Sequence, residues 1–276
     1  MKRTLLSIAA FVLLLSACKK DDAAPAEEWI LTKFTNIDVE RQDTVTTSLK
    51  YNTSSVLSEL TESGADGDQP YSFTSYPVFE GSKLTKIMES DLEVTTPTIR
   101  NSFEYTGNNV TRINTYGFDQ AQEWTIEEYY EVLYNAQNKI SELRRKSIAA
   151  PDYAAIYKVT WENENVKSVT TFNVAGTDTS QGSTNNFTYD DQPNIVKALF
   201  KDNYMWLSSP TSFEYLSANN LAKHETLYSG EVYTRDTFEF KFNEKNQLTE
   251  QKVRSEQLMD QPSVSNSIVT FTYTKK

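Results

Sequence analysis

Residues 238–248 read Phe-Glu-Phe-Lys-Phe-Asn-Glu-Lys-Asn-Gln-Leu. Phe238, Phe240 and Phe242 alternate with charged residues, and this is the period of side chains on one face of a β-strand. The polar stretch that follows is rich in residue types that form turns and tolerate left-handed backbone. Leu248 then restarts a strand, so the whole stretch predicts a β-hairpin.

The same order of aromatic residue, polar turn and aliphatic residue recurs along the chain. The aromatic positions are 26 to 31 residues apart, and they are Tyr51, Phe79, Tyr105, Tyr134, Trp161, Tyr189, Tyr215, Phe242 and Tyr273. Aliphatic residues such as Val110, Ile140, Val166 and Leu221 follow the turns. Eight copies and a terminal half-copy predict consecutive hairpins of roughly 27 residues each.

Consecutive hairpins form an antiparallel up-and-down meander. We therefore predict an all-β fold of about 16–18 strands. Its one apolar face must be buried, so we expect the meander to roll into a barrel-like or flattened shell. Residues 120–146 test this prediction, because their Glu, Gln, Ala and Leu content also suits a helix. Tyr134 and Ile140 keep the hairpin register in that segment, and we predict strands there.

Composition and charge favour a single domain and argue against nucleic acid as a partner. Aromatic residues make up 12% of the chain, and the aromatic type favours half-buried pleated surfaces. No Pro-, Gly- or Ser-rich linker divides residues 29–276, which we predict to be a single domain. The formal net charge of −11 excludes nucleic acid as the main partner, because phosphate binding needs clustered Lys and Arg.

The N-terminus has the features of a bacterial lipoprotein. Lys2 and Arg3 precede an apolar run that is too short to span the roughly 30 Å core of a bilayer, so residues 1–17 are predicted to be a signal peptide. The run ends in Leu-Ser-Ala-Cys, which resembles the lipobox of bacterial lipoproteins. The resemblance implies cleavage before Cys18 and attachment of lipid to it, and Cys18 is the only cysteine of the chain. Residues 18–28 are charged and small, which favours a flexible tether.

Lipidation predicts an outer-membrane anchor in a Gram-negative bacterium, on the periplasmic side or at the cell surface. The acidic residues Asp21 and Asp22 follow the cysteine closely. They resemble the surface-export signals of some Gram-negative lineages, and a plain solvated spacer explains them equally well.

The repeat also resembles known families. An aromatic-x-Tyr unit with a polar turn and Leu-x-x-Ile is similar to the YD repeats of RHS-type proteins. The short chain behind a lipobox more closely resembles a family of secreted bacterial lipoproteins of unknown function (the DUF4595 type). That resemblance implies a porin-like meander barrel over about residues 44–276 and no catalytic residue. The sequence departs from strict YD repeats, because only Asp190 places an Asp directly after the repeat aromatic.

A porin-like shape raises the question of a membrane pore. The segment Ile140–Lys146 carries charge on both faces of its predicted strand, and Leu248–Glu256 is polar on both faces. A lipid-facing strand needs an unbroken apolar face, and a midplane Arg or Lys costs roughly 2–4 kcal/mol. We therefore expect the apolar face to point inward.

The sequence holds no recognisable catalytic or metal-binding motif. The single histidine, His224, occupies a slot that sister repeats fill with an aliphatic residue, and we interpret it as a structural strand residue. One histidine and a lipidated cysteine make a zinc site unexpected. Asp66-Gly67-Asp68 offers oxygens to Ca²⁺, but a plain loop is the better interpretation because no further carboxylates follow. We expect no cofactor and no metal.

Four tryptophans remain to be assigned. Trp161 occupies a repeat core position, and Trp29 borders the tether and receives no role. Trp124 and Trp206 lie between repeats, where aromatics can stack on sugars or apolar ligands, or simply pack in the core. The favoured function is a non-enzymatic cell-envelope binding or scaffold module, with a glycan or a peptide as ligand. The alternative is a glycan-processing hydrolase with an unrecognised carboxylate pair.

Overall fold

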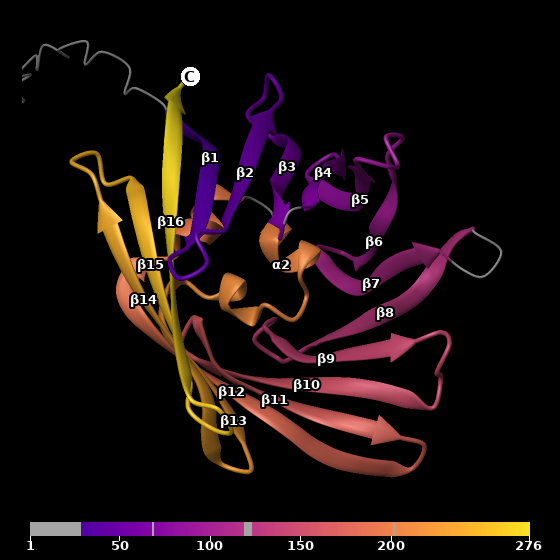
Figure 1. Ribbon diagram of the computed structural model, residues 1–276. Helices are drawn as coiled ribbons and strands as arrows, with labels where there is room; N and C mark the ends of the chain where they lie inside the picture. Colours follow the sequence, from indigo (N-terminus) through magenta and orange to yellow (C-terminus); the bar gives the residue numbers. More distant parts are fainter. Residues whose placement is uncertain (1–28, 68, 119–122, 201–202) are drawn as a thin grey trace, which may run out of the picture.

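The computed structural model describes residues 29–67, 69–118, 123–200 and 203–276. The predicted signal peptide, Cys18 and the tether 18–28 lie outside these residues, as does Asp68 of the Asp66-Gly67-Asp68 loop. Among the described residues the chain forms one closed antiparallel barrel of sixteen strands (Figure 1). This confirms the predicted all-β meander and shows that the sheet closes on itself.

The strands follow one another around the barrel in chain order. They are β1 (Trp29–Asp38), β2 (Thr44–Tyr51), β3 (Leu57–Asp66), β4 (Gln69–Glu80), β5 (Lys83–Asp91), β6 (Thr98–Thr106), β7 (Asn109–Phe118), β8 (Trp124–Tyr134), β9 (Ile140–Ser147), β10 (Tyr153–Glu162), β11 (Asn165–Ala175), β12 (Asp178–Pro193), β13 (Asn219–Tyr228), β14 (Glu231–Phe242), β15 (Leu248–Gln257) and β16 (Ser263–Lys275). β8 and β9 confirm the predicted strands in the described part of that segment, residues 123–146. β1 precedes the repeats and closes the barrel by pairing with β16.

The repeat aromatic marks a fixed irregularity in each hairpin. The strand register shifts directly before Tyr51, Phe79, Tyr105, Tyr134, Trp161 and Phe242. Such a β-bulge bends the strand and re-aims the side chain that follows it. The hydroxyl of Tyr134 donates to the backbone oxygen of Val110 at 2.9 Å, and Nε1 of Trp161 donates to that of Ile140 at 2.7 Å. The aromatic position of one hairpin is thereby bonded to the aliphatic position of the preceding hairpin.

Asparagine explains why the turns need little glycine. Oδ1 of Asn135 accepts hydrogen bonds from the backbone N–H groups of Gln137 and Lys139, at 3.0 and 2.9 Å. Asn138 lies between them with a φ of 59°, a left-handed conformation that asparagine tolerates better than most residues. Asn243 and Asn246 repeat this arrangement in the hairpin of β14 and β15.

One part of the repeat prediction is wrong. Tyr189 pairs directly with Leu221 in the hairpin of β12 and β13, and the segment between these strands forms α1 (Ile195–Leu199), α2 (Tyr204–Ser208) and the 3₁₀ helix η2 (Phe213–Leu216). Tyr215 therefore lies in a helical turn and is no repeat aromatic. The insertion spans residues 194–218, and by coincidence it places Tyr215 at the repeat spacing of 26 residues from Tyr189. We call the described residues of this insertion, 194–200 and 203–218, the plug.

The plug folds into the barrel because its apolar residues find partners there. Phe200, Tyr204, Trp206, Leu207, Phe213 and Leu216 belong to the same buried cluster as Leu31, Leu49, Leu84, Val110, Ile140 and Val166, which lie near the turn ends of six strands around the barrel. Figure 1 shows the plug in orange across the inside of the ring of strands. Oδ1 of Asn194 caps α1 by accepting from the N–H of Lys197.

The plug is also tied to the barrel by polar contacts. Oδ1 of Asn165 accepts from the backbone N–H groups of Ala218 and Asn219, at 2.9 and 3.0 Å. The N–H of Val166 donates to the hydroxyl of Ser217, which itself donates to Tyr189. Trp29 and Lys275 pair at this same end of the barrel, so both ends of the described chain lie at the plug.

Candidate functional site

The first of two candidate sites lies between the plug and the repeat turns. This plug-end cavity has a volume of about 480 Å³. Its walls are repeat aromatics, aliphatic residues, four asparagines and four charged residues, and the principal members are Tyr105, Tyr134, Trp161, Asn108, Asn109, Asn138, Asn203, Lys83, Lys139, Lys197, Glu164 and Trp206. The cavity therefore combines aromatic faces with amide and ammonium donors.

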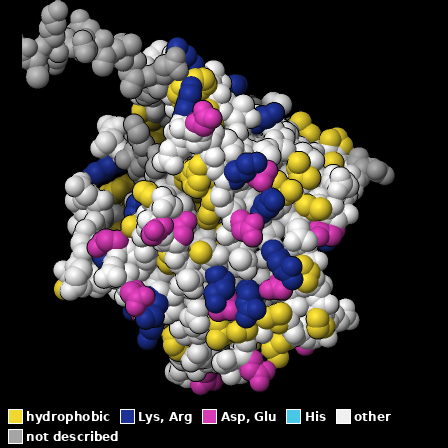
Figure 2. Space-filling view, turned by 90° about the vertical axis from the view of Figure 1, so that its left-hand side faces the viewer, with side chains coloured by type: hydrophobic (Ala, Val, Ile, Leu, Met, Phe, Trp, Pro, Cys, Tyr) yellow, Lys and Arg dark blue, Asp and Glu magenta, His cyan; other side chains and the backbone are white. Residues whose placement is uncertain are grey.

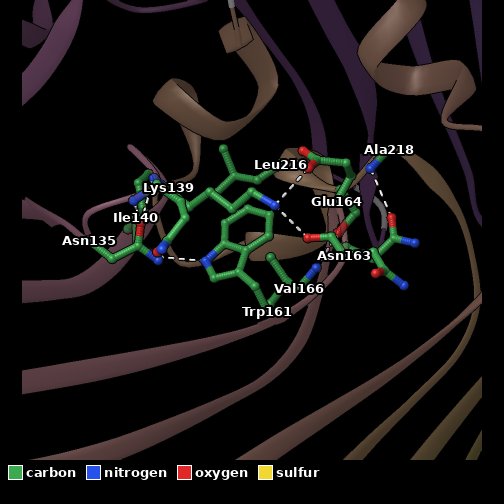
Figure 3. Close-up of polar contacts among 12 residues, drawn as sticks. Asn135, Lys139, Ile140, Trp161, Asn163, Glu164, Val166, Leu216 and Ala218 are labelled. Atoms are coloured by element: carbon green, nitrogen blue, oxygen red, sulfur yellow. Dashed lines mark hydrogen bonds and ion pairs between the residues drawn. The ribbon is translucent and has the colours of Figure 1, made fainter.

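Lys139 shows how this wall is built (Figure 3). Its side chain extends past the Trp161 ring, with Nζ 5.3 Å from the ring centroid. Nζ donates to the backbone oxygen of Asn163 and lies 2.8 Å from Oε1 of Glu164. These contacts connect the hairpin turn of β8–β9 to that of β10–β11. Neighbouring turns of this wall are thus joined by side-chain contacts. Many of the polar groups in the wall are already hydrogen-bonded within the protein.

The second site is the luminal cavity, which lies beneath the plug inside the barrel and has a volume of about 490 Å³. Its polar lining includes Asn185, His224, Asp236, Thr171 and Glu214, and its apolar lining includes Tyr157, Phe187, Phe213 and Phe238. Residues of five consecutive strands, β10 to β14, meet η2 of the plug here. A cavity of this size suits a small ligand, for which pockets of about 300–1,000 Å³ are usual.

His224 lies at the centre of the polar lining. Nδ1 of His224 is 3.3 Å from Oδ2 of Asp236, and Nε2 is 3.0 Å from Oδ1 of Asn185. The imidazole stacks on the Phe187 ring with a centroid distance of 5.0 Å. Thr226 also donates to Oδ1 of Asn185, at 2.9 Å. The side chains are therefore held in fixed orientations around the cavity, which is the condition for selective binding of a polar ligand.

Two carboxyl groups of the luminal cavity are shifted in opposite directions. Glu214 belongs to η2 of the plug, and burial of its carboxyl group raises the pKa of Glu214 above its ordinary value of 4.5. The hydrogen bond with His224 is the largest cause that lowers the pKa of Asp236 below its ordinary value of 3.8. The two pKa values are therefore shifted apart, and catalytic acid–base pairs show a separation in the same sense.

The predicted ligand contacts lie at opposite ends of the barrel. Trp206 belongs to α2, is only 2% exposed, and donates from Nε1 to the backbone oxygen of Pro210 at 2.9 Å. Trp124 begins β8 at the other end and packs on Phe118 with a centroid distance of 4.3 Å. The structure does not bring the two together, and their contact with a ligand stays a prediction. Trp29 lies under Lys245, whose Nζ is 4.1 Å from the Trp29 ring centroid.

Sequence reasoning missed the luminal cavity. His224 does occupy a luminal strand position, as its place in the repeat predicted, but its neighbours there come from other strands. Asp236 and Asn185 are 12 and 39 residues away. The register of the repeat could have identified the luminal strand residues, because residues two positions apart share a face of a strand. Glu214 comes from the plug, and no sequence pattern placed it in the lumen. In the part of the chain that the structure describes, no three His, Cys, Asp or Glu side chains are grouped to hold a metal.

Ion pairs cover the outer wall of the barrel. Arg235 lies 2.8 Å from Glu225 on β13 and 3.9 Å from Glu256 on β15, and Arg254 lies 2.9 Å from Glu256. Lys and Arg side chains mix with Asp and Glu over the wall seen in Figure 2. Among the described residues, no helix is long and apolar enough to cross a bilayer.

Comparison with known proteins supports the fold. No family model and no curated protein matches the chain. A crystal structure of a porin-like protein from Bacteroides uniformis matches with a TM-score of 0.52 and 12% identity, over 88% of this chain and 98% of that chain. A porin-like protein from Bacteroides vulgatus matches with a TM-score of 0.41 and 10% identity, over 90% and 99%. The first likeness shows that this chain has the porin-like meander fold, as the family resemblance implied.

Proposed function

We propose that this protein is a lipid-anchored binding module of the Gram-negative cell envelope, and that its ligand site is the luminal cavity. The observation that carries this proposal is the plug. A sixteen-stranded barrel is wide enough to leave an aqueous channel, but here one end is filled by buried side chains. The interior is a blind chamber, which retains a ligand and does not conduct one.

The outer wall supports a barrel that stands in water. Charged residues lie in the middle of the outer face of β9, where Arg144 pairs with Glu142 and Lys146 with Glu131 at 3.1 Å. Such residues at the centre of a bilayer cost roughly 2–4 kcal/mol each. A wall of this kind needs another attachment to the envelope. The predicted lipid on Cys18 supplies one, and the described chain begins at Trp29, at the plug end.

The chemistry of the luminal cavity favours a saccharide or a short peptide. Both ligands present hydroxyl or amide groups that an asparagine, a threonine and a carboxylate can bind. The aromatic rings of Tyr157 and Phe187 offer apolar faces beside these groups.

The test is a binding screen of the full chain carrying Cys18→Ser, with turnover measured in the same wells. Envelope and dietary oligosaccharides and short peptides serve as ligands, and thermal shift is the first readout. We expect a ligand whose affinity falls about tenfold or more in Asp236→Asn. Glu239→Gln is the matched control, because Glu239 is an exposed residue of the same strand. Equal loss in both variants, or none in Asp236→Asn, contradicts the assignment of the luminal cavity.

The opposed pKa shifts of Glu214 and Asp236 favour one second candidate, a glycan-processing hydrolase. In that reading Glu214 is the proton donor and Asp236 the ionised partner. The candidate predicts turnover that is lost in both Glu214→Gln and Asp236→Asn while binding persists. Binding without turnover in the wild-type chain contradicts it and leaves the binding module.

A further inference from the structure

Exposed hydrophobic side chains gather at the end of the barrel opposite the plug. Nine large hydrophobic residues of the described chain are strongly exposed, between 38% and 62%. Leu92, Phe118, Ile148, Tyr153 and Tyr228 lie in or beside the connections at this end, which we call the mouth. Val39, Leu258 and Val264 lie there too, and we call these eight residues the collar. Figure 2 shows hydrophobic side chains near the lower edge of the wall.

Single exposed hydrophobic residues are normal on any protein surface. Their distribution is the informative point here, because only Val78 lies outside the collar, on the outer face of β4. Apolar groups gathered at one place, with polar groups around them, mark interaction surfaces. The repeat turns at the plug end carry no member of this set.

The mouth is also acidic. The fully described connections, each taken with one flanking strand residue on either side, are 38–44, 91–98, 147–153, 175–178, 228–231 and 257–263. Each of these stretches contains at least one Asp or Glu, and Arg41 is the only Lys or Arg within them. Behind the mouth, Glu62 and Glu89 lie on the luminal faces of β3 and β5, and Glu89 is ion-paired with Arg100 at 3.7 Å.

The acidic charge of the mouth indicates which kind of partner can cover its hydrophobic residues. Two copies meeting mouth to mouth bring two acidic rims together, and like charges repel. Anionic lipid headgroups are disfavoured for the same reason. The chain before Trp29 joins the barrel at the plug end, away from the collar. A partner with cationic and apolar groups complements both the acidic charge and the exposed hydrophobic residues of the mouth.

We propose that the collar is a docking surface for a partner protein that presents a cationic, apolar polypeptide segment to the mouth. Apolar contact with the collar supplies the burial, and the acidic rim supplies orientation and selectivity. The plug end, where the described chain begins, stays free for attachment to the membrane. The proposal is independent of the ligand of the luminal cavity, because it rests on the rim residues.

The test uses the full chain carrying Cys18→Ser and synthetic peptides of equal length. One peptide alternates leucine with lysine, and the others replace lysine by glutamine or by glutamate. We expect calorimetric binding of the lysine peptide that weakens with added salt, and binding at least about tenfold weaker for the other two. The pair Ile148→Ser with Tyr153→Ser, and the pair Glu93→Gln with Asp152→Asn, should each weaken binding of the lysine peptide by a similar factor.

Val78→Ser is the control, since it removes an exposed hydrophobic residue outside the collar. Circular dichroism melts establish that every variant is folded, and surface changes of this kind alter stability little. Equal binding of the lysine and glutamine peptides overturns the proposal, as does equal weakening by Val78→Ser. Collar-dependent dimerisation in sedimentation, or collar-dependent binding to vesicles of phosphatidylglycerol, without peptide binding, assigns the surface to another occupant and also overturns it.

Discussion

Truncating Phe213 tests whether the plug closes the barrel. Phe213 of η2 is 1% exposed, and its ring centroid lies 6.1 Å from that of Tyr157 on β10. Replacing a buried phenylalanine by alanine costs about 3–5 kcal/mol. We expect the lower end of that range, because Phe213 also lines the luminal cavity and water can enter part of the space it leaves. For a domain of this size about 3 kcal/mol lowers the melting temperature by roughly 6–12 °C.

Scanning calorimetry of Phe213→Ala beside Phe118→Ala gives the comparison. Phe118 lies at the mouth, and its main contact is the Trp124 ring at 4.3 Å. Losing such an exposed aromatic pair costs about 1 kcal/mol, or roughly 2–4 °C. Phe213→Ala should therefore melt well below Phe118→Ala when both are scanned at the same rate. If the two variants melt together, the plug is not packed in the barrel, and the argument for a blind chamber fails with it.

Three further outcomes are expected. Cys18→Ser should abolish labelling by an alkynyl fatty acid and release the protein from membranes, with the melting temperature unchanged; equal labelling of variant and wild type contradicts lipidation. Phe240→Ala should lower the free energy of unfolding by about 3 kcal/mol, and Lys241→Ala by no more than about 0.5 kcal/mol, because the two side chains face the lumen and the water respectively; similar melts contradict this alternation. Because the folded-state pKa of Glu214 is raised, the contribution of Glu214 to stability falls as pH rises from 4.5 through that folded-state pKa. Glu214→Gln should therefore be the more stable protein at neutral pH, with the advantage vanishing well below pH 4.5, and urea melts at the two pH values check this.

The barrel strands could be predicted from the sequence because each hairpin repeats the same alternation of aromatic residues and the same turn spacing. Alternating aromatics such as Phe238 and Phe240 define one face, and the spacing of the repeat defines the turns. The pairing partners then follow, because neighbouring hairpins need no long connection. Closure had no such signal, since β1 precedes the repeat and becomes the partner of β16 only when the meander has curved fully around.

The plug could not be predicted for a related reason. Tyr189 and Tyr215 have the spacing of a repeat, and Ile195 and Val196 have the apolar character of a second strand. The segment differs from a hairpin only in its tertiary contacts. Its hydrophobic residues pack against the inside of the barrel, and the segment does not pair with a neighbouring strand. One local feature does mark it, namely Pro193 followed by Asn194, which ends a strand and caps a helix.

The position of the luminal cavity follows from where the repeat places its apolar residues. The aromatic and aliphatic positions flank the turn, so the apolar part of every hairpin lies at the plug end. Further along the same luminal faces, β2 carries Thr47, β6 carries Asn101 and β14 carries Asp236. Sixteen strands enclose more space than strand side chains alone can fill, and an apolar insertion is stable only where the walls are apolar. The plug therefore packs at the turn end, and the part of the lumen farther from the turns is left more polar and open to a ligand.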